Sequence, residues 1–462
     1  MTTSSIPASI FRAYDIRGVV GDTLDADIVR QVGHAIGSEG RDRGVTELVV
    51  ARDGRHSSPA LAAALAEGLN AAGCDAVDIG CVPTPVMYFA THHLQTGSGV
   101  VITGSHNPPA YNGMKVMLAG ETLSGDAIAG LYQRLTAGQL HHGSGATRLR
   151  EDILDAYVER ITGDIRPAKP LKLVLDAGNG VAGAVAPRLF EALGCEVEAL
   201  YCEVDGNFPN HHPDPAEPAN LTTLIQRVRE SGADLGLAFD GDGDRLGVID
   251  SGGKIIWPDR QLMLYARDVL SRQAGATILF DVKCTMHLAH VIEKAGGKPV
   301  MGRTGHSLIK AEMKRIKAAL AGEMSGHTFF AERWYGFDDG LYTGARLVEI
   351  VAGDGRPSAE IFDELPEGVS TPELKISVPE DEQQAIMERL AEQGRWEFED
   401  ANVITIDGIR VEWPDGWGLV RASNTTPVLV LRFEANDEQA LGRIRQAFQG
   451  LLDKVKPGLE VP

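Results

Sequence analysis

Residues 47–80 read ELVVARDGRHSSPALAAALAEGLNAAGCDAVDIG, and the fold prediction begins from them. An apolar strand over Leu48–Ala51 leads into a glycine-containing loop. Ser58 is expected to cap the helix that follows, with Pro59 at the first helical position. This start signal predicts a helix directly after a buried strand.

The rest of the same segment predicts the helix itself and a second strand. Leu61, Leu65 and Leu69 recur every four residues, which places them on one helical face. Gly73 is expected to end the helix, and residues 75–80 are predicted to form the next strand. Strand, helix and strand in this order form a βαβ unit, so the two strands should pair in parallel.

The same unit recurs twice further along the chain. The second copy is KLVLDAGNGVAGAVAPRLFEALGCEVEALY (172–201), with Gly194 at the end of the helix. The third copy is TILFDVKCTMHLAHVIEKAGGKPVMG (277–302), with Gly296 and Gly297 in that place.

One aspartate stands at the equivalent strand end in each copy: Asp53, Asp176 and Asp281. They are about a hundred residues apart, which is the size of a small domain. This internal repetition predicts three related α/β domains with βαβ units.

The last hundred residues have a different pattern. Residues 402–435 alternate apolar and polar side chains around the turn signals Asp407-Gly408 and Asp415-Gly416, which indicates antiparallel strands. Residues 437–455 follow as an amphipathic helix. The sequence therefore predicts a C-terminal α+β domain with an antiparallel sheet. The expected domain boundaries are 1–150, 151–251, 252–367 and 368–462.

Composition narrows the possible functions. The chain has 462 residues, 43% of them apolar, and a formal net charge of −20. That charge disfavours binding to nucleic acid or to an anionic membrane, and an anionic substrate would need a dedicated cluster of cations. We see no transmembrane run, no secretory signal and no CxxC motif among the five cysteines. These features indicate a cytoplasmic protein with reduced thiols; the oligomeric state stays open, and a monomer is compatible.

One loop presents a single hydroxyl. In the segment VVITGSHNPPAYNGMK (100–115), an apolar strand leads to Ser105. We expect this serine on an exposed turn between Gly104 and His106. Lys115 follows ten residues later.

The acidic segment LGLAFDGDGDRLGVID (235–250) is the most informative part of the sequence. Asp240, Asp242 and Asp244 alternate with glycines, so in an extended segment they would point the same way and converge. Carboxylates so close would repel one another, and oxygen ligands alone favour Mg²⁺. Arg245 beside them suits a bound anion, and a phosphorylated Ser105 could supply a further oxygen.

Two other interpretations of this segment stay open. One is a calcium loop of the EF-hand type, but its sixth position, which needs glycine, is Arg245, and its twelfth, which needs glutamate, is Ser251. The other is a solvated acidic turn that holds no ion.

Four short segments resemble one known family. They are TGSHNP (103–108), DGDGDR (240–245), GEMSGH (322–327) and RASNTTP (421–427), and the opening FRAYDIRG (11–18) and RTGHS (303–307) fit as well. Together and in this order they are similar to the signatures of the α-D-phosphohexomutases, most of all the bacterial phosphomannomutase/phosphoglucomutase branch. The resemblance runs through the whole chain.

The resemblance implies four domains around a central cleft, each giving one loop. The first loop would carry the phosphoserine, Ser105, which would also bind the metal with Asp240, Asp242 and Asp244. The third would bind the sugar and the fourth the substrate phosphate; the residues that match are Glu323, Ser325, His327, Arg421, Ser423, Asn424 and Thr425.

The implied reaction moves a phosphoryl group between the 1- and 6-hydroxyls of glucose or mannose phosphates, through a hexose 1,6-bisphosphate that also acts as activator. Positive charge would come from Mg²⁺, Arg245 and Lys115. The candidates for proton transfer are Arg17, Lys115, His106 and His327, which the sequence does not rank.

Further residues are expected to face the cleft. Tyr14 and Arg17 should reach it near Ser105, and Lys283 and His306, which follow strands of the third domain, should contact substrate. His211 and His212 lie in a proline-rich loop (207–220) that we interpret as bordering the cleft rather than binding metal.

Rival functions remain. A phosphatase-like hydrolase would use the same serine and metal, but would not need the fourth loop. A calcium-binding, non-enzymatic module would give Ser105 no role. A phosphoglucosamine mutase is a rival within the family, although Met324 in the sugar-reading loop favours the mannose/glucose branch.

Overall fold

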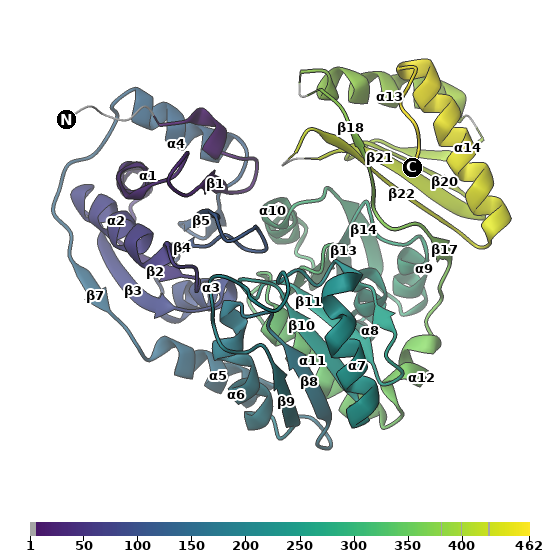
Figure 1. Ribbon diagram of the computed structural model, residues 1–462, viewed down its shortest axis with the longest axis horizontal. Helices are drawn as coiled ribbons and strands as arrows, with labels where there is room; N and C mark the ends of the chain where they lie inside the picture. The colour runs from purple at the N-terminus through teal and green to yellow at the C-terminus, as the bar shows by residue number, and fades with distance from the viewer. Residues whose placement is uncertain (1–5, 380, 399, 424–425) are drawn as a thin grey trace.

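The computed structural model describes residues 6–379, 381–398, 400–423 and 426–462. The four predicted units follow one another in an arc, with the first and fourth at its ends (Figure 1). Each unit is built around its own sheet, so the predicted four-domain α/β class is confirmed. No helix within the described ranges is long and apolar enough to cross a membrane.

The first unit has a mixed sheet in the order β1-β5-β4-β2-β3-β7, with β6 paired to β5. The strands are β1 (Ile16–Val19), β2 (Glu47–Arg52), β3 (Asp75–Cys81), β4 (Gly99–Ile102), β5 (Tyr111–Leu118), β6 (Glu121–Thr122) and β7 (Thr147–Leu149). The helices are η1 (Ala8–Ile10), α1 (Ala26–Asp42), α2 (Ser58–Ala71), α3 (Thr84–His93) and α4 (Asp126–Thr136). As predicted, β2 pairs with β3 in parallel.

The predicted helix cap in this unit is wrong. Helix α2 has Ser57 at its N-cap with no side-chain cap bond, and Ser58 already lies inside the helix. The Ser58 hydroxyl instead donates a 2.5 Å hydrogen bond to Asp53. That carboxylate also accepts from the backbone N–H of Gly104 at 2.9 Å, so the strand-end aspartate holds the serine loop.

The second unit has the sheet order β12-β11-β10-β8-β9. Its elements are α5 (Ile153–Asp164), β8 (Lys172–Asp176), η2 (Val181–Ala184), α6 (Ala186–Ala192), β9 (Glu196–Leu200), η3 (Pro218–Leu221), α7 (Thr222–Ser231), β10 (Leu235–Phe239), β11 (Leu246–Asp250) and β12 (Ile255–Ile256). Strands β8 and β9 form the predicted parallel pair, and β10 and β11 form an antiparallel hairpin.

The third unit has the sheet order β14-β13-β15-β16, with β13 and β14 parallel. Its elements are α8 (Pro258–Arg272), β13 (Thr277–Asp281), α9 (His287–Lys294), β14 (Lys298–Gly302), α10 (His306–Ile316), β15 (Leu320–Gly322), β16 (Thr328–Phe330), α11 (Gly340–Asp354) and α12 (Ser358–Asp363).

The fourth unit has the predicted antiparallel sheet, in the order β17-β22-β21-β20-β19, with β18 paired to β22. Its elements are β17 (Val369–Ser370), β18 (Leu374–Ser377), α13 (Gln383–Glu397), β19 (Asn402–Ile404), β20 (Ile409–Trp413), β21 (Gly416–Ala422), β22 (Val428–Ala435) and α14 (Glu438–Val455). Helices α13 and α14 cover one face of the sheet (Figure 1).

The hydrophobic core joins the first three units. One continuous cluster of buried side chains includes Val49 of the first unit, Phe190 of the second and Phe280 of the third. The fourth unit has a separate core and meets the third through a small cluster that contains Val282 and Trp417. The exact domain boundaries stay predictions, and β12 pairs with the second sheet although it follows the predicted boundary at residue 251.

Candidate active site

Ser105 lies directly beyond β4, and the backbone holds it in an unusual conformation. Its φ angle is 47°, a left-handed value that is uncommon for a residue other than glycine. The hydroxyl of Thr103 accepts its N–H at 2.8 Å, and the Arg55 guanidinium donates to its carbonyl at 2.8 Å. The predicted exposed turn is wrong, because Ser105 is only 5% exposed. The acidic loop of the second unit covers it.

The three aspartates converge, but for a different reason from the predicted one. Residues 240–244 form the turn of the β10–β11 hairpin rather than an extended segment, and Gly243 takes a φ of 78° there. Asp240, Asp242 and Asp244 are fully buried, and one oxygen from each lies within 4.8 Å of the others.

Two cations from this chain partly neutralise the three carboxylates. Lys115 donates to Asp242 Oδ2 at 2.8 Å and also contacts Asp244. Arg245 bridges Asp240 Oδ2 and Asp214 Oδ1, both at 3.1 Å. The loop therefore keeps an excess of negative charge in a buried place.

The pKa values follow this charge distribution. Burial, with Asp244 second, raises the pKa of Asp240 to about 7. Burial also opposes the ionisation of Asp244, but Lys115 and His327 hold the pKa of that carboxyl well below its usual range. Burial alone would lower the pKa of Lys115, yet Asp242 and Asp244 raise it well above the ordinary value, so this lysine is a fixed cation.

The residues present fit a divalent metal ion. Asp242 Oδ1 is buried and has no hydrogen-bond partner among the described residues, and Asp244 Oδ1 has only an ion pair, with His327 Nε2 at 3.4 Å. Unpaired buried carboxylate oxygens are costly unless a cation faces them. A second possible metal cluster contains Asp244, His327 and Asp338. It fits less well, because Asp338 already pairs with Lys310 and the imidazole already lies between Asp244 and Glu323.

Ser105 stands beside the acidic loop. Its hydroxyl donates to Asp240 Oδ2 at 3.3 Å and lies 3.2 Å from Nδ1 of His106. The charge of Arg245 and then burial lower the pKa of His106 to about 3. The imidazole is therefore neutral near neutral pH, but with this pKa it is a weak base.

The third loop meets the acidic loop through His327. Its Nε2 lies 3.4 Å from Asp244 Oδ1, and its Nδ1 lies 3.3 Å from Glu323 Oε2. Burial alone would lower the pKa of His327, but Asp244 and Glu323 raise it to about 10. Ser325 Oγ lies 2.9 Å from Nδ1 of His327. Residues 323–326 form a turn rather than the expected extended loop, yet Glu323 and Ser325 do reach a common point, because both contact Nδ1 of His327.

His306 and Lys283 also lie at this side of the third unit. His306 is the first residue of α10, and its ring stacks on that of His327, with centroids 5.6 Å apart. Lys283 follows β13 and pairs with Glu373 at 3.2 Å. Both follow strand ends, as the sequence predicts.

The fourth loop is connected to the third unit through Asp407. This carboxylate pairs with Arg421 at 3.1 Å and accepts the N–H of Thr304 at 2.9 Å. Ser423 follows β21 and its Oγ lies 3.1 Å from Oγ1 of Thr426. Two further predicted residues of this loop, Asn424 and Thr425, lie outside the described residues.

The two residues of the opening motif lie in different places. Arg17 donates to the carbonyl of Thr103 at 3.1 Å, beside the serine loop as expected. Tyr14 was expected there too, but its hydroxyl donates to the carbonyl of Thr304 at 2.8 Å. Its ring packs on Gly305 of the third unit, where an added Cβ would lie 2.5 Å from Cζ of Tyr14.

Three contacts of the site were not predicted from the sequence. Thr84 donates to Asp242 Oδ2 at 2.6 Å, Asp214 pairs with Arg245, and Arg55 shapes the serine loop. In the sequence, only two features could have indicated these residues. Asp214 lies in the proline-rich loop, and Arg55 lies just after a strand. His211 pairs with Asp176 at 3.0 Å and is in no metal cluster found among the described residues.

The fold and the site together define a class: a four-unit α/β protein in which a buried serine meets an acidic, metal-compatible loop. Four models of phosphoglucomutase/phosphomannomutase domains match most of the chain, from residue 8 to residue 451. They are alpha/beta/alpha domain I (residues 8–142), domain II (155–253), domain III (257–369) and the C-terminal domain (373–451).

Individual relatives agree with the family models. The phosphomannomutase/phosphoglucomutase of Pseudomonas aeruginosa is 57% identical over 458 residues, which is 99% of this chain and 98% of that protein. The phosphoglucomutase of Neisseria gonorrhoeae is 51% identical over 453 residues, 97% of this chain and 98% of that protein. A crystal structure of a phosphoglucomutase/phosphomannomutase family protein from Burkholderia thailandensis superposes with a TM-score of 0.94 at 55% identity, covering 99% of this chain and 100% of that one. The chain belongs to the phosphoglucomutase/phosphomannomutase family.

Proposed function

We propose that this chain is an isomerase that interconverts glucose 1-phosphate with glucose 6-phosphate, and mannose 1-phosphate with mannose 6-phosphate. The observation that carries the proposal is the hydroxyl of Ser105, 3.3 Å from Asp240 in a buried acidic loop. The names of the relatives support the same activity.

Ser105 would carry the phosphoryl group. The free hydroxyl of the sugar phosphate attacks the phosphorus, the bond from phosphorus to Ser105 Oγ breaks, and a hexose 1,6-bisphosphate forms. The bisphosphate then reorients in the site by about half a turn. Ser105 Oγ attacks its other phosphate, and the isomeric monophosphate leaves. Positioning and charge neutralisation carry phosphoryl transfer, so the main role of Lys115 and Arg245 is to supply fixed positive charge.

The attacking hydroxyl must lose a proton in each half-reaction. His106 is placed for this role, because its Nδ1 lies 3.2 Å from Ser105 Oγ. The charge of Arg245 makes it a weak base, so it can act only when bound phosphate offsets that charge. His327, a protonated imidazole between Asp244 and Glu323, is suited to donate. Lys115 and Arg17 fit electrostatic roles better, because nearby aspartates raise the pKa of each.

The resident metal would be held by Asp240, Asp242, Asp244 and Ser105. When bound, Mg²⁺ supplies positive charge that neutralises phosphate oxygens.

The third and fourth loops would bind the two ends of the substrate. Glu323 Oε2 is buried, its only partner among the described residues is His327 Nδ1 at 3.3 Å, and it makes no hydrogen bond, so its remaining lone pair can accept from a sugar hydroxyl. Arg421 presents a planar fork to the distal phosphate. Tyr14, Lys283, His306, Ser325 and Ser423 complete the proposed substrate set, with Asn424 and Thr425 outside the described residues.

If the site binds the O3 and O4 hydroxyls, these contacts are kept when the sugar is inverted end for end. The site would then distinguish the two configurations at C2 only weakly. Glucose and mannose phosphates should then differ by less than roughly 10³-fold in kcat/KM, about 4 kcal/mol. A larger preference would contradict this part of the proposal.

The direct test follows both products of glucose 1-phosphate in the presence of Mg²⁺ and a trace of glucose 1,6-bisphosphate. We expect glucose 6-phosphate without matching release of inorganic phosphate. Phosphate release without isomerisation would instead identify the hydrolase. The dependence on the bisphosphate activator and the cytoplasmic location stay predictions.

A further inference from the structure

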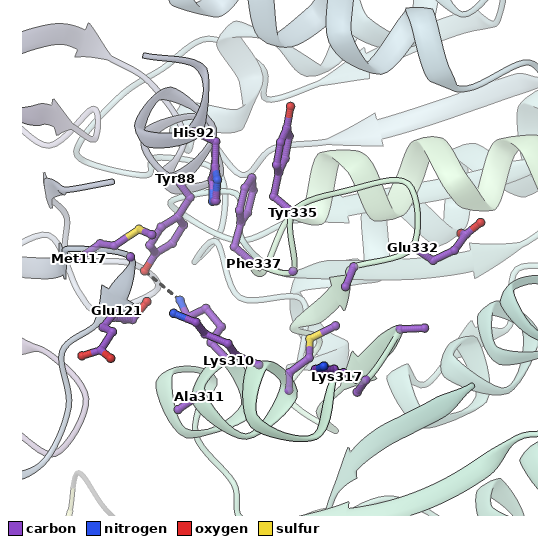
Figure 2. A pocket seen from close by; sticks show the side chains of 18 of the residues that line it. Tyr88, His92, Met117, Glu121, Lys310, Ala311, Lys317, Glu332, Tyr335 and Phe337 are labelled. Carbon is purple, nitrogen blue, oxygen red and sulfur yellow. Dashed lines mark hydrogen bonds between the residues drawn. The ribbon is translucent and has the colours of Figure 1, made fainter. Parts of the chain in front are cut away.

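A large cavity lies between the first and third units, apart from the reaction loops. Its volume is about 840 Å³, within the range of small-molecule sites. Helix α3 and the β5–β6 turn line one side, and α10 with residues 331–337 line the other (Figure 2). None of the predicted site residues lines it.

One wall of the cavity is aromatic. The rings of Tyr335 and Phe337 are parallel within 2°, with centroids 6.0 Å apart, and the ring of His92 lies 4.8 Å from that of Tyr335 (Figure 2). Tyr335 is 38% exposed, which is high for a large aromatic side chain. His92 already stacks on Tyr335 and Phe337, so a flat aromatic group would extend this stack from its outer side.

The charge that remains free in the cavity is positive. Its carboxylates are already paired: Glu121 with Arg43 at 3.4 Å, and Glu332 with Arg272 at 2.8 Å. Lys314 and Lys317 are exposed, and neither has an ion-pair partner within the described part of the chain. Two free cations beside an aromatic wall form a positive site on a chain of net charge −20.

The backbone adds an independent observation at Lys317. This residue ends α10 in the left-handed conformation, with φ 55°. Glycine is the usual residue there because it has no steric penalty. The chain instead has a lysine here, and this lysine lines the cavity.

We propose that this cavity binds a planar aromatic anion of the nucleotide class. Its base stacks against the wall of Tyr335 and His92, and its phosphate pairs with Lys314 and Lys317. The site is separate from the reaction cleft, and its occupancy does not depend on the proposed mutase activity.

Because the cavity lies between two units, a bound ligand would affect how these units are arranged. A ligand there touches the first and third units at once. Helix α10 begins at His306 in the active site, and Lys310 of the same helix pairs with Asp338 at 2.8 Å. A ligand that binds only this arrangement stabilises it by mass action.

The test measures binding of AMP, GMP, CMP and UMP to the full chain by calorimetry, with saturating glucose 1-phosphate and Mg²⁺ present. We expect saturable binding of at least one nucleotide at a single site. If AMP binds, adenosine and inorganic phosphate should each bind at least about tenfold more weakly than AMP. If another nucleotide binds, the same comparison is made with the nucleoside of that nucleotide.

Matched variants locate the site. The double variant Lys314→Glu/Lys317→Glu should weaken the binding at least about tenfold, and Tyr335→Ala should weaken it as well. The control Lys294→Glu/Lys298→Glu changes two exposed lysines elsewhere in the third unit and should bind as the unaltered chain does. Unchanged basal activity in both lysine variants shows that they fold.

Several results would overturn the proposal. They are no saturable binding of any of the four nucleotides up to about 10 mM, unaltered binding in Lys314→Glu/Lys317→Glu, and inorganic phosphate binding as tightly as the nucleotide. Loss of nucleotide binding in Arg421→Ala would assign the ligand to the substrate-phosphate loop and overturn it too.

Discussion

At the scale of single residues, the site depends on one serine held in an unfavourable backbone conformation. Ser105 keeps its φ of 47° because neighbouring side chains hold the loop around it. The Arg55 guanidinium donates to four loop carbonyls, those of Ser105, Asn107, Pro108 and Tyr111. Strain of this kind persists only when the surroundings determine it.

Replacement of that arginine should release the loop. Arg55→Lys keeps the charge but loses the planar fork, so we expect the free energy of unfolding to fall by about 2–3 kcal/mol and kcat to fall roughly 10-fold or more. Urea denaturation and steady-state kinetics measure both. Arg52→Lys, at a partly exposed arginine at the end of β2, is the control. Equal kinetics in the two variants would contradict the role given to Arg55.

Which residues the sequence could predict depends on where their partners lie. Ser105 and the three aspartates stand in short motifs whose chemistry is local. Thr84 donates to an aspartate 158 positions away, so its role exists only after two units pack together. Sequence patterns predict residues of the first kind and miss those of the second.

At the scale of elements, the serine loop and the acidic turn can meet because residue 241 is glycine. A Cβ atom there would lie 2.3 Å from the carbonyl oxygen of Ser105. That distance is far below van der Waals contact, so any side chain at this position would push the two loops apart.

Gly241→Ala should therefore damage catalysis more than folding. We expect kcat to fall roughly 10²-fold, since a displacement of about 1 Å has such effects. Gly130→Ala is the matched control, because nothing lies within 4 Å of its added Cβ, and it should keep full activity. Near-normal kcat in Gly241→Ala would show that the loop contact is not needed.

The acidic turn should also make the stability of the chain depend on metal. Mg²⁺ at about 100 times its Kd should add about 2.7 kcal/mol to the free energy of unfolding relative to chelator, because it relieves repulsion among buried carboxylates. Asp240→Asn should reduce this gain and the exposed control Asp22→Asn should keep it, as thermal unfolding with and without chelator will show. The same Mg²⁺ gain in Asp240→Asn would contradict the predicted site.

Element types followed from the hydrophobic pattern, whereas local geometry did not. The βαβ copies and the antiparallel C-terminal sheet were predicted correctly because burial fixes the period of apolar residues. The cap at Ser58 was wrong because Asp53 competes for its hydroxyl. The prediction of an extended acidic segment was wrong, because a hairpin turn brings the same carboxylates together.

At the scale of the whole molecule, hydrogen bonds link the two ends of the arc through the third unit. Tyr14 of the first unit donates to the carbonyl of Thr304, whose N–H donates to Asp407 of the fourth. The order of the units could be predicted from the repeats. The core shared by the first three units could not, because it depends on packing between segments far apart in sequence.

Removal of the Tyr14 hydroxyl tests this link. Burial raises the pKa of Tyr14 to about 12, so the group remains a donor near neutral pH. Tyr14→Phe should lower the free energy of unfolding by about 1 kcal/mol, whereas Tyr132→Phe, also in the first unit, should change it little. Equal stability of Tyr14→Phe and the unaltered chain would contradict the link.

The most direct test of the account is the intact mass of the chain after incubation with glucose 1,6-bisphosphate and Mg²⁺. A gain of about 80 Da, located at residue 105 by fragmentation, is the predicted result. Ser105→Ala should show neither this gain nor sugar-phosphate interconversion, while the control Ser144→Ala, at an exposed serine, should show both. A phosphoryl group on another residue, or interconversion that survives in Ser105→Ala, would contradict the account.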